Sequence, residues 1–494
     1  MTAEDLNAAV RRHVLARLQE WHGIDPTRIN CDQPLAELGF TSRDSVALAA
    51  ELSELAGVKL PTTVLWEAPT VDRLARRVAG EAAVAQEQAA ATKEAVNAPT
   101  TLPTVDGAIA VVGIGCRLPG SISSPADFWR LLSDGADGVG TMPPDRWEGF
   151  VAIDDPHVLE VGLHGGFLDD IAGFDAEFFG IPPSEAAVMD PQQRMLLEVA
   201  HEALDHAAIC AGGLAGSRTG VFVGISGNEY ARLTTADLSR IDAWTPPGAA
   251  LSIAANRLSY TLDLRGPSVA LDTACSSSLV AVHHAARSLS TGECDLALAG
   301  GVNALLSPVI TLAFQRAGAL APDGRCKAFD AAANGMVRSE GCSVLVLRRL
   351  VDAERSGDRV LAVIRGSAVN SDGRSNGLLA PNAEAQRALL QHVYAVGGPV
   401  APEQLDYVEA HGTGTALGDP VEAGALGSVL GAGRAPDQPL LTGSVKTNLG
   451  HLEAAAGITS LAKTVLALTT GRCRSSCTSP SRVRTSTSRR TRFA

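Results

Sequence analysis

The residue of this 494-residue chain that points most clearly to chemistry is Cys275, which lies where a predicted strand turns into a predicted helix. Residues 269–272 alternate as a strand does, and apolar residues recur every three to four positions over 279–287. On a helix's first turn, unpaired backbone N–H groups and the positive dipole end favour thiolate over thiol. We therefore predict that Cys275 is an unusually acidic nucleophile, in a corner similar to the nucleophile elbow with sulfur in place of oxygen. The alternative is a buried structural cysteine.

Two histidines in the second half are candidate partners of this thiol. His411 follows a short predicted strand, 407–410, on a turn where Gly412 and Gly414 let a backbone or ligand come near. His451 lies on a loop that leads into a predicted helix, 453–468. A single histidine at a strand end is more often structural, but two beside glycines favour a site. Neutral imidazoles can donate N–H groups to an oxyanion, an interaction that is strongest in a dry pocket.

The segments around these three residues resemble the motifs of β-ketoacyl synthases, the condensing domains of type I polyketide and fatty acid synthases. They read D-T-A-C-S-S-S-L from residue 272, E-A-H-G-T-G-T from 409 and G-S-V-K-T-N-L-G-H-L-E-A-A-A-G from 443, in the family's order. The resemblance implies that Cys275 takes an acyl group from a pantetheine thioester. A malonyl-type thioester then loses CO₂, and His411 and His451 hold the enolate that attacks the acyl-cysteine. This is chain extension by decarboxylative Claisen condensation.

The same resemblance assigns supporting roles. Thr413 and Thr415 would bind the pantetheine arm, and Lys446 would pair with Asp419 and Glu422 and so hold the histidine loop. The alternative for that triad is a solvated surface pair of little energetic value. A thiolase, the nearest enzymatic alternative, would carry a second cysteine late in the chain, where histidines stand here.

Residues 1–86 predict a small four-helix bundle that resembles an acyl carrier domain. Apolar residues follow one face of a helix over 6–21, and Thr70 is the expected N-cap of the last helix. By resemblance, Ser42 carries covalent 4′-phosphopantetheine, although Thr41 stands where the family has aspartate. Ser45 is the competing site, three residues too far from the Leu-Gly pair. A helix N-terminus favours the phosphodiester, while a plain N-cap is the structural alternative for Ser42.

A flexible linker is predicted over 87–106, where Ala, Gln, Thr and Pro show no apolar period. In the following synthase domain, 107–470, strands alternate with helices and so predict parallel sheets covered on both faces. The resemblance sharpens this to a thiolase-like α/β fold of two βαβ halves in five layers, usually a homodimer. Gly113 and Gly115 lack the third glycine of a dinucleotide fingerprint, so nucleotide binding is not expected there.

Composition excludes several other classes. The net charge of −13 argues against nucleic acid, and no apolar run reaches membrane-spanning length. The nine cysteines lack metal-ligand spacing and a disulfide pattern, so no metal site is expected and the thiols are interpreted as reduced. Without a signal-peptide core at the N-terminus, a cytoplasmic location is expected.

Residues 471–494 form an Arg/Ser/Thr-rich tail in which the resemblance ends. In the family a Gly-rich oxyanion-hole motif and a final strand would follow, so we interpret this domain as C-terminally truncated. The alternative function is therefore a catalytically impaired fragment that acts only as an acyl carrier or dimerising scaffold. The sequence does not specify the starter or the extender, and because it carries no acyltransferase motif we expect the extender to be delivered from elsewhere. Expected partners are acyl and malonyl-type thioesters, a phosphopantetheinyl transferase, an acyl-activating ligase, and an acyltransferase or downstream modules in trans.

Overall fold

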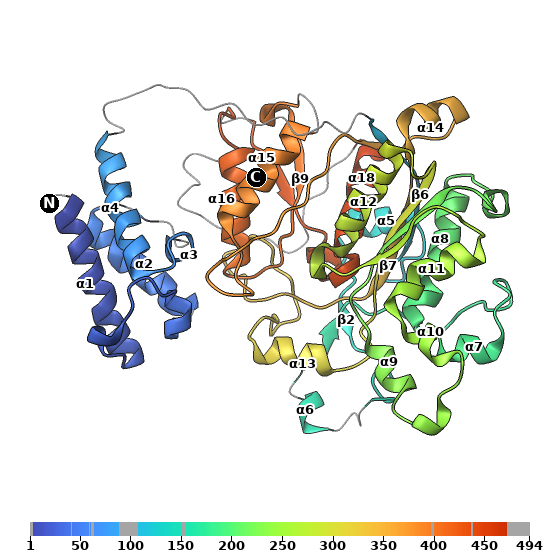
Figure 1. Cartoon of the computed structure of the whole chain (residues 1–494), viewed down its shortest axis with the longest axis horizontal. Helices are drawn as coiled ribbons and strands as arrows, with labels where there is room; N and C mark the ends of the chain where they lie inside the picture. Colours follow the sequence, from blue (N-terminus) through green and yellow to red (C-terminus); the bar gives the residue numbers. More distant parts are fainter. Residues whose placement is uncertain are drawn as a thin grey trace.

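The computed structural model describes residues 3–40, 42–58, 60, 64–87, 107–150, 155–159, 161, 163–396, 400–435 and 438–471. A small helical bundle lies beside a larger α/β body (Figure 1). The predicted linker, apart from residue 87, and the predicted tail, apart from residue 471, lie outside the described residues. No helix of the described ranges is both long and apolar enough to cross a membrane.

The N-terminal bundle consists of α1 (Ala3–His22), α2 (Ser42–Ala56), α3 (Val64–Glu67) and α4 (Val71–Glu87). Its core contains the residues that the helical period predicts, among them Val10, Val14 and Leu18, each fully buried. Thr70 Oγ1 accepts the backbone N–H of Arg73 at 3.2 Å, which confirms the predicted N-cap of α4.

The larger body is built on a six-stranded sheet in the order β5-β4-β6-β7-β1-β8. The strands are β1 (Ile109–Arg117), β4 (Thr219–Gly224), β5 (Ser268–Leu271), β6 (Leu296–Asn303), β7 (Gly341–Arg349) and β8 (Ala362–Ile364). β5, β4 and β6 are parallel, as predicted, but β7 is antiparallel to both β6 and β1. The prediction of parallel sheets therefore holds for β5, β4 and β6 and is wrong for the antiparallel strands β7, β1 and β8. The chain from β6 to β7 makes no crossover: it leaves and re-enters at the same end of the sheet, so β7 must reverse direction.

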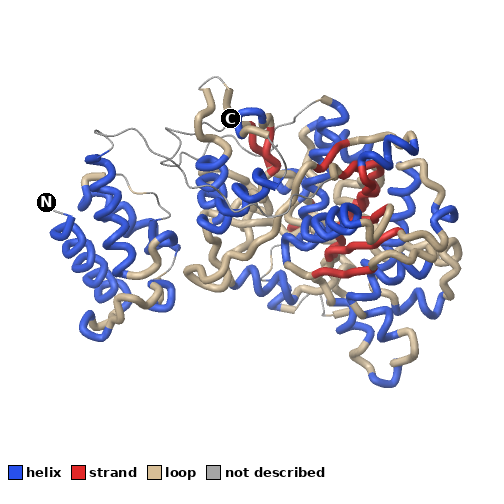
Figure 2. The backbone as a smooth tube through the Cα atoms, turned by 45° about the horizontal axis from the view of Figure 1, so that its top comes forward, coloured by secondary structure: helices blue, strands red, loops and turns tan. Residues whose placement is uncertain are grey.

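Helices cover both faces of this sheet. The helices α8 (Pro191–His206) and α11 (Leu251–Thr261) pack on one face, and α12 (Ser277–Thr291) with α18 (Ala456–Thr470) on the other. Beyond α18 lie the parallel pair β9 (Tyr407–Glu409) and β10 (Leu441–Gly443), with α15 (Ala383–Val396) and α16 (Gly418–Val429) outside them. Figure 2 shows the two groups of strands separated by helix. The order is helix, sheet, helix, sheet, helix, which are the five layers of the expected thiolase-like fold.

Shorter elements complete the body. They are α5 (Pro125–Asp134), β2 (Gly140–Thr141), α6 (Pro156–Leu159), β3 (His164–Gly165), α7 (Pro183–Val188), α9 (Glu229–Thr234), α10 (Thr245–Ala249), α13 (Val309–Arg316), α14 (Leu350–Ser356) and α17 (Lys446–Leu449).

Glycines let the start of α12 approach the segment that leads into α18. A Cβ on Gly301 of β6 would lie 2.5 Å from Ser278 Cβ and 3.0 Å from the carbonyl oxygen of Ala454. A Cβ on Gly457 would lie 2.6 Å from Leu279 Cγ. The Ile458 N–H donates to Ser278 Oγ at 3.0 Å across the same contact. The segments that carry Cys275 and His451 are therefore packed at backbone distance.

This packing predicts that Gly301→Ala destabilises the protein by about 1–3 kcal/mol, because the added methyl group overpacks the junction. Gly424→Ala in α16 is the matched control. No atom lies within 4 Å of its added Cβ, so the helix should gain roughly 0.5–1 kcal/mol from the lost glycine flexibility. Chemical denaturation of both variants measures the difference. Equal free energies of unfolding for Gly301→Ala and Gly424→Ala would show that the junction can accommodate the added methyl group.

Candidate active site

Cys275 lies on a strained turn between β5 and α12. The turn is the single 3₁₀ turn Ala274–Ser276, and Ala274 has φ +54°, a left-handed conformation that costs a non-glycine residue about 1–3 kcal/mol. The Ala274 N–H donates to Asp272 Oδ1 at 2.9 Å, and Ser277 Oγ accepts the Thr273 N–H at 2.8 Å. These bonds hold the corner, and Cys275 is exposed on it. The predicted elbow geometry is present, one turn ahead of α12 rather than inside it.

The expectation of an unusually acidic thiol is wrong for this structure. The protein packed around the corner raises the pKa of Cys275 even though part of its surface is open, and the nearby carboxylate of Glu453 raises it further. The Lys446 ammonium and a backbone hydrogen bond oppose these effects without reversing them. The prediction counted only the helix N-terminus and left out desolvation, which sequence does not show.

The structure brings His411 and His451 together from segments that are 40 positions apart. Their ring centroids are 5.5 Å apart and the ring planes meet at 85°. His451 is 1% exposed, and its Nδ1 accepts the backbone N–H of Glu453 at 2.9 Å. In the neutral ring the proton is therefore on Nε2, which is free to donate.

Both imidazoles are held neutral. The protein packed around its ring lowers the pKa of His411 to about 3 even though part of this residue is open to the cleft, and the Lys446 ammonium adds to the effect. The pKa of His451 lies well below its ordinary value because of burial, with further lowering by Lys446, His411 and Arg338. Neutral N–H donors are what an oxyanion site requires.

Two carboxylates fix the turn that carries His411. Glu422 accepts the backbone N–H groups of His411 and Gly412 at 2.6 and 2.8 Å, and Asp419 accepts that of Gly414 at 3.1 Å. Gly412 and Gly414 have φ values of +46° and +75°. A Cβ on Gly412 would lie 2.8 Å from that of Ser444, so the predicted close approach is present.

Lys446 is 2% exposed and acts on the site through its charge. Among the described residues, no ion pair within 4.0 Å joins Lys446 to Asp419 or Glu422, so the predicted triad is wrong in its pairing. The reason is that both carboxylates are already used by backbone N–H groups. Lys446 nevertheless lowers the pKa of Glu422 through space, against the larger effect of burial.

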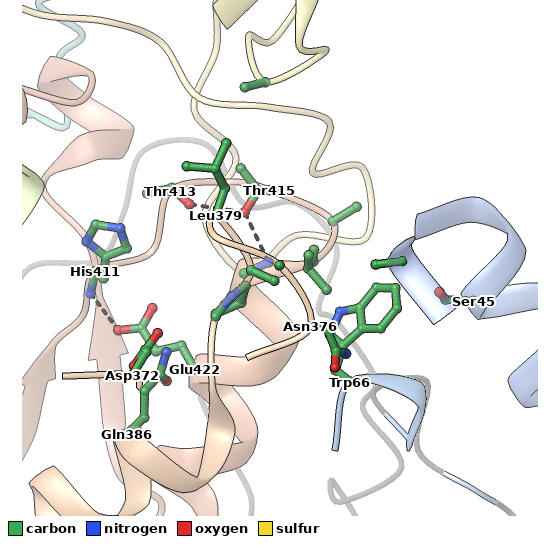
Figure 3. Close-up of a pocket in the computed structure, with 18 of the residues that line it drawn as sticks. Ser45, Trp66, Asp372, Asn376, Leu379, Gln386, His411, Thr413, Thr415 and Glu422 are labelled. Atoms are coloured by element: carbon green, nitrogen blue, oxygen red, sulfur yellow. Dashed lines mark hydrogen bonds between the residues drawn. The ribbon is translucent and has the colours of Figure 1, made fainter. Parts of the chain in front are cut away.

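The predicted pantetheine contacts line one cleft of about 1350 Å³ (Figure 3). His411, Thr413 and Thr415 line it, and the two threonine hydroxyls are 3.1 Å apart. Ser42 is the first residue of α2 in the N-terminal bundle. Ser45, one turn later, is 1% exposed.

Sequence reasoning missed the part played by Glu453 and Arg338. Glu453 orients His451 through its backbone N–H, and its carboxylate pairs with Arg338, which is 4% exposed. Glu453 stands inside the third motif and could have been considered. Arg338 lies in the long irregular segment before β7 and carries no local signal. Among the described residues, no group of three His, Cys, Asp or Glu side chains could hold a metal ion.

Comparison with known proteins matches these features to a family. Residues 106–353 match the Beta-ketoacyl synthase, N-terminal domain, and residues 361–478 match its C-terminal domain. The chain belongs to the β-ketoacyl synthase family. Residues 12–78 match the Phosphopantetheine attachment site, so this condensing domain follows a carrier domain, as the sequence predicts.

The relatives are polyketide synthases. The chain is 55% identical over 454 residues to a phenolphthiocerol/phthiocerol polyketide synthase of Mycobacterium tuberculosis, covering 91% of this chain and 24% of that protein. It is 45% identical to polyketide synthase GfsA of Streptomyces halstedii, over 91% of this chain and 6% of that protein. The chain thus spans a quarter or less of these two curated relatives.

Solved ketosynthases share the fold. The oxazolomycin ketosynthase domain OzmH KS7 of Streptomyces albus superposes with a TM-score of 0.73 at 38% identity, over 79% of this chain and 68% of that one. The module 6 ketosynthase of the bacillaene synthase of Bacillus subtilis 168 gives a TM-score of 0.68 at 39% identity, over 76% and 63% of the two chains. The predicted fold class is confirmed.

The buried neutral His451 predicts a pH dependence of stability. Because its pKa is lowered on folding, the unfolded chain binds more protons below about pH 6.5, and stability is lost as the pH falls through that value. His451→Gln removes this titration and keeps an acceptor for the Glu453 N–H. Urea unfolding between pH 7.5 and 5 should therefore show a steeper loss for the wild type than for the variant. Parallel losses would contradict a neutral buried ring.

Proposed function

We propose that this chain is the loading carrier and condensing segment of a modular polyketide synthase. An acyl starter carried by the N-terminal domain passes to Cys275 and is extended by decarboxylative Claisen condensation with a malonyl-type thioester. The observation that carries the proposal is the pair of neutral histidines, whose ring centroids are 5.5 Å apart, together with the contact between the strained turn of Cys275 and the turn Glu453–Ala455 that follows His451.

In the first half-reaction, Cys275 attacks the carbonyl carbon of an acyl thioester. A new carbon–sulfur bond forms to Cys275, and the bond to the departing thiol breaks. Since the thiol's pKa is raised in the resting protein, Cys275 gives up its proton as it attacks, and the departing pantetheine sulfur takes up a proton and leaves as a thiol. The Lys446 charge favours the thiolate in that step.

In the second half-reaction, a malonyl-type thioester loses CO₂, and the electron pair of the broken carbon–carbon bond forms an enolate. The N–H groups of His411 and His451 stabilise the enolate oxygen. Its carbon attacks the acyl-cysteine, and Cys275 leaves as the new carbon–carbon bond forms. Decarboxylation generates the carbanion, so no strong base is needed and neutral imidazoles suffice.

The cleft of Figure 3 supports delivery from the attached carrier. One wall is formed by carrier residues, including Ser45 and Trp66, and the other by the turn with His411, Thr413 and Thr415. The Asn376 side-chain amide donates to the carbonyl oxygen of Leu65 at 3.0 Å across the two parts. A contact held by a hydrogen bond of this kind can form and break, as a carrier that must bind and leave requires.

The bundle fits 4′-phosphopantetheine at Ser42. This serine begins a helix of 15 residues, whose N-terminal N–H groups and dipole favour a phosphodiester. Ser45 is a poor acceptor because it is almost wholly buried. The attached group supplies the thiol that carries the acyl chain, and Thr413 and Thr415 would bind its arm in the cleft.

The proposal includes the division of the chain into carrier (1–86), linker (87–106), synthase domain (107–470) and tail (471–494).

A homodimer is supported by β5, an edge strand whose residues are all only partly buried. A cytoplasmic location is supported by the described cysteines, all of which are free thiols. The phosphopantetheinyl transferase, the acyl-activating ligase and the source of the extender would be separate proteins or modules.

Labelling with a radioactive acyl group tests the proposed function. The holo chain is charged on its carrier, and label is followed from Ser42 to Cys275 by peptide mapping. Cys275→Ala should retain label on Ser42 only. Ser42→Ala should not receive phosphopantetheine from the transferase and so should take up no label, whereas Ser45→Ala should be modified and labelled normally. Wild-type label confined to Ser42 would favour the alternative function, a carrier without condensing activity.

Asn376→Ala tests delivery through the cleft. Losing one hydrogen bond worth about 0.5–1.5 kcal/mol should slow transfer from Ser42 to Cys275 by roughly 3- to 10-fold. Acylation of Cys275 by a free acyl-N-acetylcysteamine thioester, which needs no carrier, should not change. Equal slowing with the attached carrier and with the free thioester would mean that Asn376 acts on the synthase site itself. No slowing with either acyl donor would show that this contact plays no part in delivery.

A further inference from the structure

A buried ion pair joins Glu409 and Lys463, which lie on the strand before His411 and on the helix after His451. Glu409 ends β9, two residues before His411, and Lys463 is on α18, the helix that follows His451. Glu409 Oε2 and Lys463 Nζ are 2.7 Å apart, and each side chain is 5% exposed. Figure 1 shows β9 beside α18, so this pair joins the small sheet to the central helix layer.

The Glu409 carboxylate also binds the segment that carries Lys446. Its Oε1 accepts the backbone N–H of Val445 at 2.5 Å, and Val445 directly precedes Lys446. The parallel pairing of Glu409 with Gly443 brings the two strands together at this point, and the Ala410 N–H donates to the Gly443 carbonyl at 2.8 Å. One carboxylate thus ties β9, which leads to His411, to the segment before Lys446 and to α18, the helix that follows the His451 loop.

The other contacts of the pair restrict it further. The Tyr407 hydroxyl donates to Glu409 Oε2, and Lys463 Nζ lies 5.6 Å from the centroid of the Tyr407 ring. A buried carboxylate with an ammonium, a hydroxyl and a backbone N–H around it has little freedom to move. Losing one partner of such a pair leaves an uncompensated buried charge, and the neighbouring backbone must shift to solvate it.

We propose that Glu409 and Lys463 are positioning residues that set the spacing between the two histidines for decarboxylation and carbon–carbon bond formation. The inference rests on the proposed roles of His411 and His451. Glu409 and Lys463 touch no substrate in this scheme. Acylation of Cys275 uses the turn between β5 and α12, which is not a partner of the pair, and uses Lys446 only through the charge of its ammonium. The pair should therefore affect the second half-reaction far more than the first.

The test separates the two half-reactions in the whole holo protein. Single-turnover acylation of Cys275 is measured with a labelled acyl thioester, and release of CO₂ is measured with a malonyl thioester. Glu409→Gln and Lys463→Met should each lower decarboxylation by about 10²-fold, the scale expected for ångström-level misplacement. Acylation should stay within roughly 3-fold of wild type.

Charge pairing predicts strong non-additivity. The neutral double variant Glu409→Gln/Lys463→Met leaves no lone buried charge, so it should decarboxylate faster than the worse of the two single variants. Tyr407→Phe, which keeps the ring and removes only the hydroxyl donor, should shift the ratio of the two rates in the same direction by a smaller factor. It provides a folded variant even if a charge variant does not fold.

Glu185→Gln is the matched control. Glu185 pairs with Arg257 at 2.5 Å, with side chains 12% and 8% exposed, between α7 and α11 on the other face of the large sheet. It should change the ratio of the half-reactions little. Unchanged ratios in Tyr407→Phe and in every charge variant that folds would overturn the positioning proposal. Failure of the wild type to acylate Cys275 or to release CO₂ would instead overturn the proposed function.

Discussion

A buried ammonium close to two neutral imidazoles, those of the buried His451 and of His411 on the cleft wall, is the interaction on which the rest of this site depends. Lys446 is 2% exposed, and its charge reaches Cys275, His411, His451 and Glu422. It opposes protonation of both rings, which leaves them as neutral donors, and it favours the thiolate at the moment of attack. A single fixed charge thereby serves both half-reactions, because each develops negative charge in the same small volume.

Holding that charge in place requires the five-layer fold. Cys275 comes from the end of a strand in the large sheet, and His411 from the end of a strand in the small one. The helix layer between the two sheets consists of α12 and α18. The start of α12 follows the Cys275 turn, and the start of α18 follows the loop with His451. Glycines at 301 and 457 let these helix starts touch, so the distance between nucleophile and donors is set by backbone packing rather than by flexible side chains.

Carboxylates fix the positions of the segments that carry the two histidines. Glu422 and Asp419 hold the turn after β9 through its backbone N–H groups, Glu409 ties β9 to α18, and Glu453 holds Arg338 while its N–H orients His451. In each case an acidic side chain binds backbone N–H groups or a buried cation. This arrangement uses strong charge-assisted bonds to fix the geometry of the backbone that carries the site.

The sequence by itself determined the family, the order of carrier and synthase, the fold class and the three motif residues Cys275, His411 and His451, since these depend on short contiguous patterns. Capping at Thr70 and the close approach at Gly412 were also predictable, because both are local. Only the tertiary structure decided the raised pKa of Cys275, the reversed direction of β7, the partners of Asp419 and Glu422, and the pairing of Glu409 with Lys463. Each of these depends on which distant segments surround a group, and desolvation and charge act through space rather than along the chain.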